Sequence, residues 1–255
     1  MEITETRIFD AHLHIIDKRY PLIFNEGFIP DEFTCEDYLE RTKRYNLCGG
    51  AVVSGSFQGT DQRFLINALR KLGPGFVGIT HLPPDVSEDY LIALDKAGIR
   101  GVRINLRRGS CIHVRSLEKM AEKVYDVAGW HTELYVDSGL LAEMSTTLAR
   151  LPSICIDHLG LSKAGFSTLL KLVEQGAHVK ATGFGRIDFD AAEAIRIIYK
   201  ANPGALIFGT DLPSTRAPRP YEDGDLCRIV NVLGAKKAGD VLYRNALSLY
   251  RPEQE

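Results

Sequence analysis

Two histidines stand two residues apart near the start of this 255-residue chain, within the apolar segment 7–16. The apolar residues around them predict a short buried strand. Since side chains alternate between the two faces of a strand, His12 and His14 should point to the same side, about 6–7 Å apart. The spacing alone is common, but two imidazoles so placed can bind one metal ion or polarise one carbonyl oxygen.

Two later apolar segments also end in polar residues. His158 follows the segment 154–157, and Asp211 follows the segment 205–208. A carboxylate beside three histidines suits hydrolysis, because it can take a proton from water and return one to the leaving group. The histidines, with or without a metal, would stabilise the developing oxyanion. The structural alternatives are a strand-capping role for His158 and a turn or helix-capping role for Asp211.

The elements that must position these residues repeat along the chain, with no break in composition and no low-complexity segment. Eight apolar segments predict strands within 7–16, 50–54, 76–81, 101–106, 132–136, 154–157, 178–182 and 205–208. Between and after them, patterns typical of helices cover 35–45, 61–72, 87–97, 114–128, 140–151, 167–175, 190–201, 225–233 and 239–248.

This alternation predicts the fold class. Short buried strands that alternate with helices pair in parallel through right-handed crossovers. Eight such units in about 250 residues predict an α/β fold of one domain over residues 1–255, a (β/α)8 TIM barrel. The rival is an open doubly wound sheet, but His-x-His stands where that fold usually carries a glycine-rich phosphate turn.

In such a barrel the functional groups lie at the carboxyl ends of the strands. Arginine grips carboxylates with two parallel hydrogen bonds, so arginines at this rim indicate an anionic substrate. A buried salt bridge for Arg103 and a solvated loop for Arg107 and Arg108 are the structural alternatives. Arg216 and Arg219 follow Asp211 and either adjust specificity or face solvent. The other polar residues expected at this rim are Ser56, His81, Asn105, Tyr135, Asp137 and Arg186.

Composition excludes several classes of protein. A formal charge of −2 and a pI of about 6.4 give no basic field for nucleic acid or an anionic membrane. Five scattered cysteines without a Cys-x-x-Cys pair indicate reduced thiols in a cytoplasmic protein. Neither a signal peptide nor a transmembrane segment is expected.

Three motifs together resemble the amidohydrolase superfamily, in particular the branch of 2-pyrone-4,6-dicarboxylate lactonase. They are Asp10-Ala-His12-Leu-His14, Ile156-Asp-His158-Leu-Gly160 and Gly209-Thr-Asp211-Leu-Pro213. Further similar stretches extend the resemblance over nearly the whole chain. It implies a barrel that hydrolyses a lactone or another ester or amide bond. Asp211 would be the general base, with His12, His14 and His158 around the scissile carbonyl.

The same resemblance implies how substrate is held. Arg103, Arg186 and one arginine of the pair that follows Asn105, for which we take Arg108, would bind substrate carboxylates. Ser56 and Tyr135 would lie beside them. The expected partner is therefore a small, carboxylated molecule, and a homo-oligomer is compatible with the sequence.

The metal content stays open. Binuclear members of the superfamily carry a lysine at the fourth strand end and a histidine at the fifth, and this chain has neither there. One zinc or manganese ion could be held by His12, His14 and Asp211, or no metal is used. The alternatives to a lactonase are a mononuclear zinc amidohydrolase or decarboxylase, and a barrel that only binds a metabolite. The presence of Asp211 argues against the last.

Overall fold

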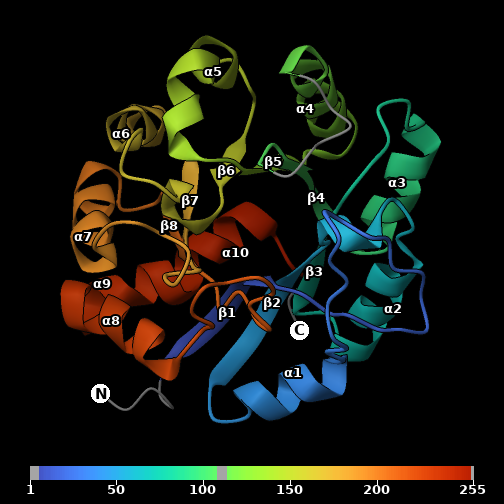
Figure 1. Ribbon diagram of the computed structural model, residues 1–255, viewed down its shortest axis with the longest axis horizontal. Coiled ribbons are helices and arrows are strands. Elements are labelled where there is room, and N and C mark those ends of the chain that lie inside the picture. The colour runs from blue at the N-terminus through green and yellow to red at the C-terminus, as the bar shows by residue number, and fades with distance from the viewer. Residues whose placement is uncertain (1–5, 108–113, 254–255) are drawn as a thin grey trace.

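The computed structural model of the chain describes residues 6–107 and 114–253. Its eight strands all run parallel, and each pairs with the next one along the chain (Figure 1). The strands are β1 (Arg7–Leu13), β2 (Asn46–Val53), β3 (Phe76–Thr80), β4 (Ile99–Asn105), β5 (His131–Tyr135), β6 (Ile154–Ile156), β7 (His178–Ala181) and β8 (Leu206–Phe208).

The first and last strands meet just beyond β8. Leu13 forms a parallel bridge with Leu212, the amide of His14 donates to Leu212 O at 2.8 Å, and the amide of Asp211 donates to His12 O at 2.7 Å. These contacts close the sheet and confirm the predicted (β/α)8 barrel.

Helices surround the strands as an outer layer (Figure 1). The sequence predicts their positions within a few residues as far as Leu233. Beyond that residue, the short helix Ala235–Gly239 is not predicted, and a π-helical segment, Asp240–Arg244, forms the first half of the expected helix 239–248. Among the described residues, no helix is long and apolar enough to cross a membrane. The helices are α1 (Cys35–Thr42), α2 (Arg63–Leu72), α3 (Glu88–Lys96), α4 (Val114–Ala128), α5 (Leu141–Leu148), α6 (Phe166–Glu174), α7 (Ala191–Ala201), α8 (Asp223–Leu233), α9 (Ala235–Gly239) and α10 (Asn245–Tyr250).

The interior of the barrel has two unlike halves. On the side of β1, β2, β3 and β8, small and branched apolar residues pack together with Tyr250 of α10, whose ring stacks on Phe9 at 5.4 Å. On the side of β5 to β7, three completely buried charged residues meet instead: Glu133, Asp157 and Lys180. The charged half lies directly beneath the residues that the sequence analysis singled out.

Candidate active site

The expected catalytic residues converge at the carboxyl ends of the strands. His12 Nε2 lies 3.8 Å from Asp211 Oδ1, and His14 Nε2 lies 3.9 Å from the same oxygen. The ring centroid of His12 is 5.1 Å from that of His14 and 4.9 Å from that of His158. All four side chains are buried. The structure therefore brings together the three histidines and the carboxylate that the motifs predicted.

Unusual backbone geometry presents two of these residues. His158 follows β6 with φ 51°, and Asp211 follows β8 with φ 62°, in a region that residues other than glycine rarely adopt. Gly183 makes room for His158, because a Cβ on Gly183 would lie 2.5 Å from His158 Nδ1. The loops after β6 and β7 are thus fitted to one another around the His158 side chain.

Neutral imidazoles dominate the site. Burial lowers the pKa of His12, and it lowers the pKa of His14 and His158 well below the usual value. His14 Nδ1 lies 2.7 Å from Val53 O. Because a carbonyl oxygen only accepts, Nδ1 of the neutral ring carries the proton and Nε2 is bare. His14 Nε2 can therefore accept a hydrogen bond or a proton, but it cannot polarise a carbonyl as a donor.

Asp211 is held on one side only. Arg186 Nε donates to Asp211 Oδ2 at 2.7 Å, and Arg186 Nη2 donates to Thr215 O at 2.8 Å. Asp211 Oδ1 is buried and has no hydrogen-bond partner. One oxygen is thus fixed by an arginine, while the other faces the histidines and can receive a proton.

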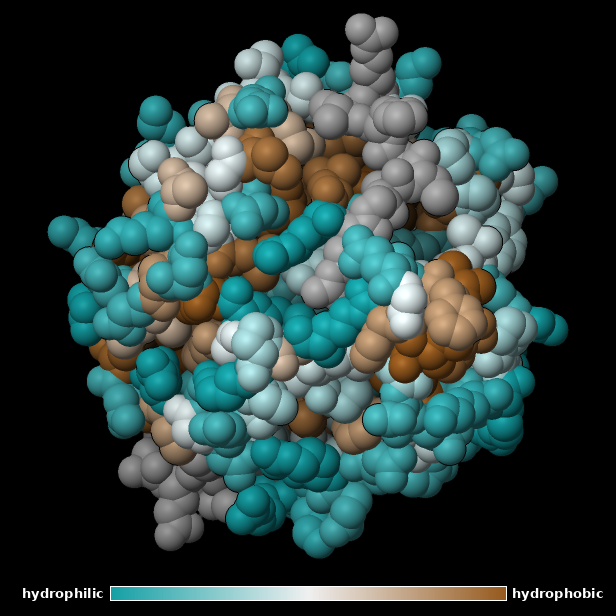
Figure 2. All heavy atoms as spheres, viewed as in Figure 1, coloured by the Kyte–Doolittle hydropathy of each residue, from teal (hydrophilic) through white to brown (hydrophobic). Residues whose placement is uncertain are grey.

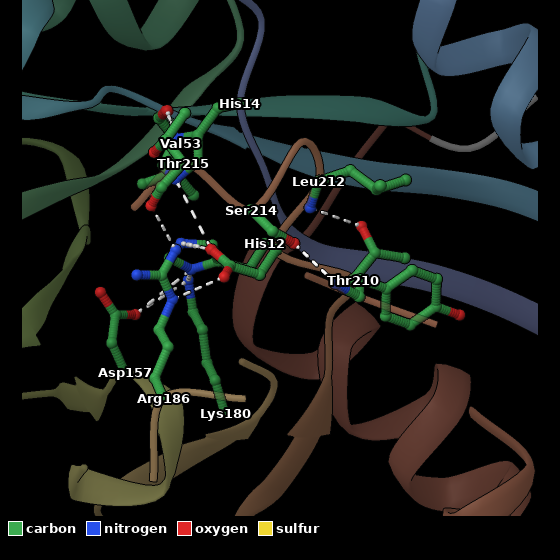
Figure 3. A network of polar contacts seen from close by, with 12 residues as sticks. His12, His14, Val53, Asp157, Lys180, Arg186, Thr210, Leu212, Ser214 and Thr215 are labelled. Atoms are coloured by element: carbon green, nitrogen blue, oxygen red, sulfur yellow. Dashed lines mark hydrogen bonds and ion pairs between the residues drawn. The ribbon is translucent and has the colours of Figure 1, made fainter. Parts of the chain in front are cut away.

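A buried ion network lies below the histidines. Lys180 Nζ is 2.6 Å from Glu133 Oε2, 3.1 Å from His12 Nδ1 and 3.5 Å from Asp157 Oδ1. Figure 3 shows Asp157 and Lys180 extending toward His12 from the same side. Lys180 is not among the site residues that the sequence predicts. One signal in the sequence could have indicated it. Lys180 is a single lysine in the short predicted strand around 178–181, and a lysine in a buried strand needs a charged partner.

Burial alone would raise the pKa of both carboxylates of this network, but the nearby cations outweigh it. Lys180 lowers the pKa of Glu133 to about 2, and Arg103 Nε, 2.9 Å from Asp157 Oδ2, holds the pKa of Asp157 well below its usual value. The carboxylates in turn raise the pKa of Lys180 against the effect of its burial. The network is therefore ionised and internally balanced.

By residue type, a divalent metal could be held in this region. One ligand atom each from His12, His158 and Asp211 lie within 4.8 Å of one another, and so do ligand atoms of His12, Glu133 and Asp157. Two observations oppose a metal on His12. The Lys180 ammonium occupies its Nδ1 side, and the buried acids are already paired with lysine and arginine. These contacts oppose a metal on Nδ1 of His12, whereas its Nε2 has no hydrogen-bond partner.

The predicted substrate-binding residues surround a pocket above the histidines. Ser56, Arg103, Tyr135 and Arg186 line it together with His14, His158 and Asp211. His12 is completely buried and lies next to Asp211 and His158. Arg103 also makes the salt bridge that was its structural alternative, and its guanidinium lies 5.0 Å from the centre of the Tyr135 ring. Arg108 lies outside the described residues.

Arg216 closes one side of this pocket. Its guanidinium lies 4.3 Å from the centre of the Phe28 ring and donates to Asn25 O, which joins the loop after β8 to the loop after β1. Both Phe28 and Arg216 line the pocket. In Figure 2 the middle of this face is largely hydrophilic, and a hydrophobic patch lies to its right. Of the two alternatives for Arg216, the structure places it at the site rather than in solvent.

The remaining histidines of the described chain lie away from the reacting groups. His81 Nε2 bonds to Ser54 O at 3.0 Å behind the pocket wall. His131 Nε2 lies 3.2 Å from Glu133 Oε1 and joins the network from below, and His178 stands at the start of β7. Of these three, only His131 contacts the ion network directly.

Comparison with known proteins identifies the family. The Amidohydrolase family model matches residues 9–251, so the chain belongs to the amidohydrolase family and is a hydrolase. A 4-sulfomuconolactone hydrolase of Hydrogenophaga intermedia is 25% identical, covering 87% of this chain and 80% of that protein. A 2-pyrone-4,6-dicarboxylate hydrolase of Comamonas testosteroni is 22% identical, covering 96% of this chain and 90% of that protein.

Solved structures share the fold. A probable 2-pyrone-4,6-dicarboxylic acid hydrolase from Acinetobacter baumannii, with citric acid bound, superposes with a TM-score of 0.84 at 22% identity, covering 96% of this chain and 99% of that one. An apo protein from Agrobacterium tumefaciens reaches 0.85 at 18% identity, covering 99% and 98%. The predicted family and its lactonase branch are confirmed.

Proposed function

We propose that this hydrolase opens the ring ester of a small carboxylated lactone, with Asp211 as the general base. The single observation that carries the proposal is the asymmetry of Asp211. Arg186 holds Oδ2, while Oδ1 is buried, unpartnered and directed at His12 and His14. The names of the relatives support the substrate class, since they describe hydrolases of a sulfonated and a dicarboxylated lactone.

The reaction follows from this arrangement. Asp211 Oδ1 takes a proton from a water molecule as the water oxygen bonds to the lactone carbonyl carbon, and negative charge develops on the carbonyl oxygen. Hydrogen-bond donors in a buried site stabilise that oxyanion. The carbonyl then re-forms, the ring C–O bond breaks, and Asp211 returns its proton to the leaving oxygen. The products are a carboxylic acid, which releases its remaining proton to solvent and becomes a carboxylate, and a hydroxyl or enol on the same open chain.

We assign complementary roles to the histidines. His12 and His158 polarise the carbonyl oxygen, while the bare Nε2 of His14 accepts a hydrogen bond from the attacking water. This changes the role expected for His14 from donor to acceptor, because its Nδ1 proton is used on Val53 O.

We place the substrate carboxylates near Arg103 and Arg186, with Ser56 and Tyr135 beside them. All four line the pocket. Both arginines carry several donors, so each can contact its buried carboxylate through Nε and still face substrate. Arg108 remains a proposed contact.

A mononuclear zinc or manganese hydrolase is the second candidate. The observation that favours it is the approach of two unpartnered buried atoms, His12 Nε2 and Asp211 Oδ1, to 3.8 Å. In that case His14 and His158 would supply the other ligands, and the metal would act as a Lewis acid on the carbonyl.

The test is hydrolysis of 2-pyrone-4,6-dicarboxylate and 4-sulfomuconolactone by protein purified without chelator, with its metal content measured by mass spectrometry. We expect turnover of at least one lactone, and an Asp211→Asn variant with kcat lowered by about 10²–10⁴-fold. Asp190→Asn is the matched control, because Asp190 caps α7 away from the site. A fully active Asp211→Asn enzyme would contradict the proposal. Activity that follows added metal would select the second candidate.

A further inference from the structure

The position of Lys180 affects where the ring of His12 carries its proton. It is completely buried in β7, and its Nζ reaches the ring of His12 on β1 at 3.1 Å. Glu133 and Asp157 lie 2.6 Å and 3.5 Å from the same nitrogen. An amine between two buried carboxylates is an ammonium group, and an ammonium group has protons to donate and no lone pair. The hydrogen bond to His12 therefore runs in one direction, from Lys180 to the ring.

His12 Nδ1 has one competing partner. Asp157 Oδ1 lies 3.4 Å from it and could accept a proton carried by Nδ1. That distance is long for a charge-assisted hydrogen bond, and Asp157 Oδ1 has no hydrogen-bond partner in the structure. The contact with Lys180 is shorter and meets hydrogen-bond geometry. Geometry thus decides between the two possible protons at Nδ1.

We propose that Lys180 is a positioning residue whose ammonium group donates to His12 Nδ1 and so holds the proton of the neutral ring on Nε2, the atom that faces Asp211. Burial and the Lys180 charge both lower the pKa of His12, which agrees with a neutral ring. Two adjacent histidines are then held in opposite tautomers. Val53 O keeps the proton of His14 on Nδ1, and Lys180 keeps the proton of His12 on Nε2.

Because their tautomers are opposite, one ring acts as a hydrogen-bond donor and the other as an acceptor. His12 presents an N–H group to the space beside Asp211 Oδ1, where a carbonyl oxygen would gain charge, and His14 presents a lone pair to the same space. A nitrogen that carries a proton cannot also bind a metal, so this assignment removes His12 from any ligand set. The role of His12 as a donor to the substrate carbonyl rests on the proposed function. The tautomer of His12 does not depend on it.

The remaining ion network explains how an ammonium group persists at this depth. Glu133 also accepts from Tyr250 Oη at 2.7 Å and contacts His131 Nε2 at 3.2 Å, so the carboxylate that pairs with Lys180 is held from below. Asp157 is held by Arg103. Each carboxylate therefore keeps its place without needing the proton of His12.

The test is two-bond ¹H–¹⁵N correlation spectroscopy of the histidine rings in uniformly ¹⁵N-labelled full-length protein near pH 7.5. The pattern of cross-peaks distinguishes a ring protonated on Nε2 from one protonated on Nδ1. His12→Gln and His14→Gln variants assign the two rings. We expect Nε2–H for His12 and Nδ1–H for His14 in the unmodified protein, a result that requires neither substrate nor turnover.

A double variant tests the role of the lysine. Lys180→Met alone would leave Glu133 as an unpaired buried charge, so we combine it with Glu133→Gln. We expect the His12 signals to shift toward Nδ1–H, now facing Asp157, while those of His14 stay unchanged. We also expect kcat on a lactone to fall by about 10²-fold with a smaller change in KM, since a donor to the oxyanion is lost. Tyr250→Phe is the matched control, because it perturbs Glu133 without touching His12.

Three outcomes would overturn the proposal: Nδ1–H for His12 in the unmodified protein, a doubly protonated His12, or a double variant that folds and keeps the Nε2–H pattern. If the double variant does not fold, the spectrum of the unmodified protein still decides the tautomer. Absence of lactone hydrolysis together with the expected spectra would reject the proposed function and leave the Lys180 assignment intact.

Discussion

The guanidinium of Arg186 holds Asp211 through Nε at 2.7 Å, and the same side chain donates through Nη2 to Thr215 O. One arginine thereby fixes both the proposed general base and the loop that follows it. Its side chain is 7% exposed, so water competes little for either contact.

Arg186→Lys should separate charge from geometry. Lysine keeps the positive charge but not the planar fork that reaches two acceptors. Because small misplacement of a reacting group can cost about 10²-fold in rate, we expect kcat/KM to fall by about 10–100-fold. Steady-state kinetics on a lactone that the enzyme turns over would measure it. Arg219→Lys is the control, since Arg219 pairs with Asp225 away from the pocket, and equal losses in both variants would contradict the argument.

Gly183→Ala should damage the site through His158. The new Cβ would lie 2.5 Å from His158 Nδ1, and φ is +60°. The backbone conformation costs about 1–2 kcal/mol for alanine, and the clash displaces the imidazole. We expect thermal unfolding to occur earlier and kcat to fall by at least about 10-fold. Gly176→Ala shares the backbone cost, because φ is +104°, but meets nothing within 4 Å. It should lose stability while retaining kcat.

The stability of the fold should fall as the pH drops from about 6.5 to 4. Burial lowers the pKa of His178 to about 4, so the unfolded chain binds a proton in this range that the folded chain does not. One proton corresponds to a slope of about 1.4 kcal/mol per pH unit. Urea unfolding at several pH values should show a shallower dependence for His178→Gln than for the unmodified protein. Parallel curves would show that His178 does not titrate as stated.

Arg216→Ala should release the loop after β1. The variant loses the contacts to Asn25 and Phe28 that close one side of the pocket. We expect faster hydrogen exchange over residues 23–33 and a KM several-fold higher, with kcat less affected because no proposed reacting group is touched. Arg219→Ala should change neither quantity, and unchanged exchange in Arg216→Ala would contradict the role of this contact.

The sequence predicts the barrel well because its information is local. Each strand is a short apolar run, each helix has its own amphipathic pattern, and eight repeats allow few topologies. The rim residues follow from the same reasoning, since the carboxyl ends of parallel strands meet at one face. The sequence therefore predicts that His12, His14, His158 and Asp211 meet at one rim of the barrel.

What the sequence could not predict are partners distant along the chain. Lys180 and Glu133 are separated by 47 positions and by the intervening strand β6, and the sequence around either residue does not indicate the other as its partner. For Arg103 the sequence left substrate binding and a buried salt bridge open, and the partner, Asp157, depends on the register between strands. The tautomer of His14 depends on Val53 O in the same way. Such contacts decide which nitrogen of each histidine carries a proton, and therefore which ring can donate a hydrogen bond to the substrate.

Tyr250 makes the centre of the barrel depend on a helix that is translated after all eight strands. The hydroxyl of this residue, in the last helix, completes the hydrogen bonding of Glu133 and also reaches Ala11 O in the first strand. A nascent chain can therefore build all eight strands and still hold a poorly satisfied carboxylate at its centre. We expect ribosome-bound chains that lack α10 to remain loosely packed and to compact in one late step, with the reaction centre assembled only then.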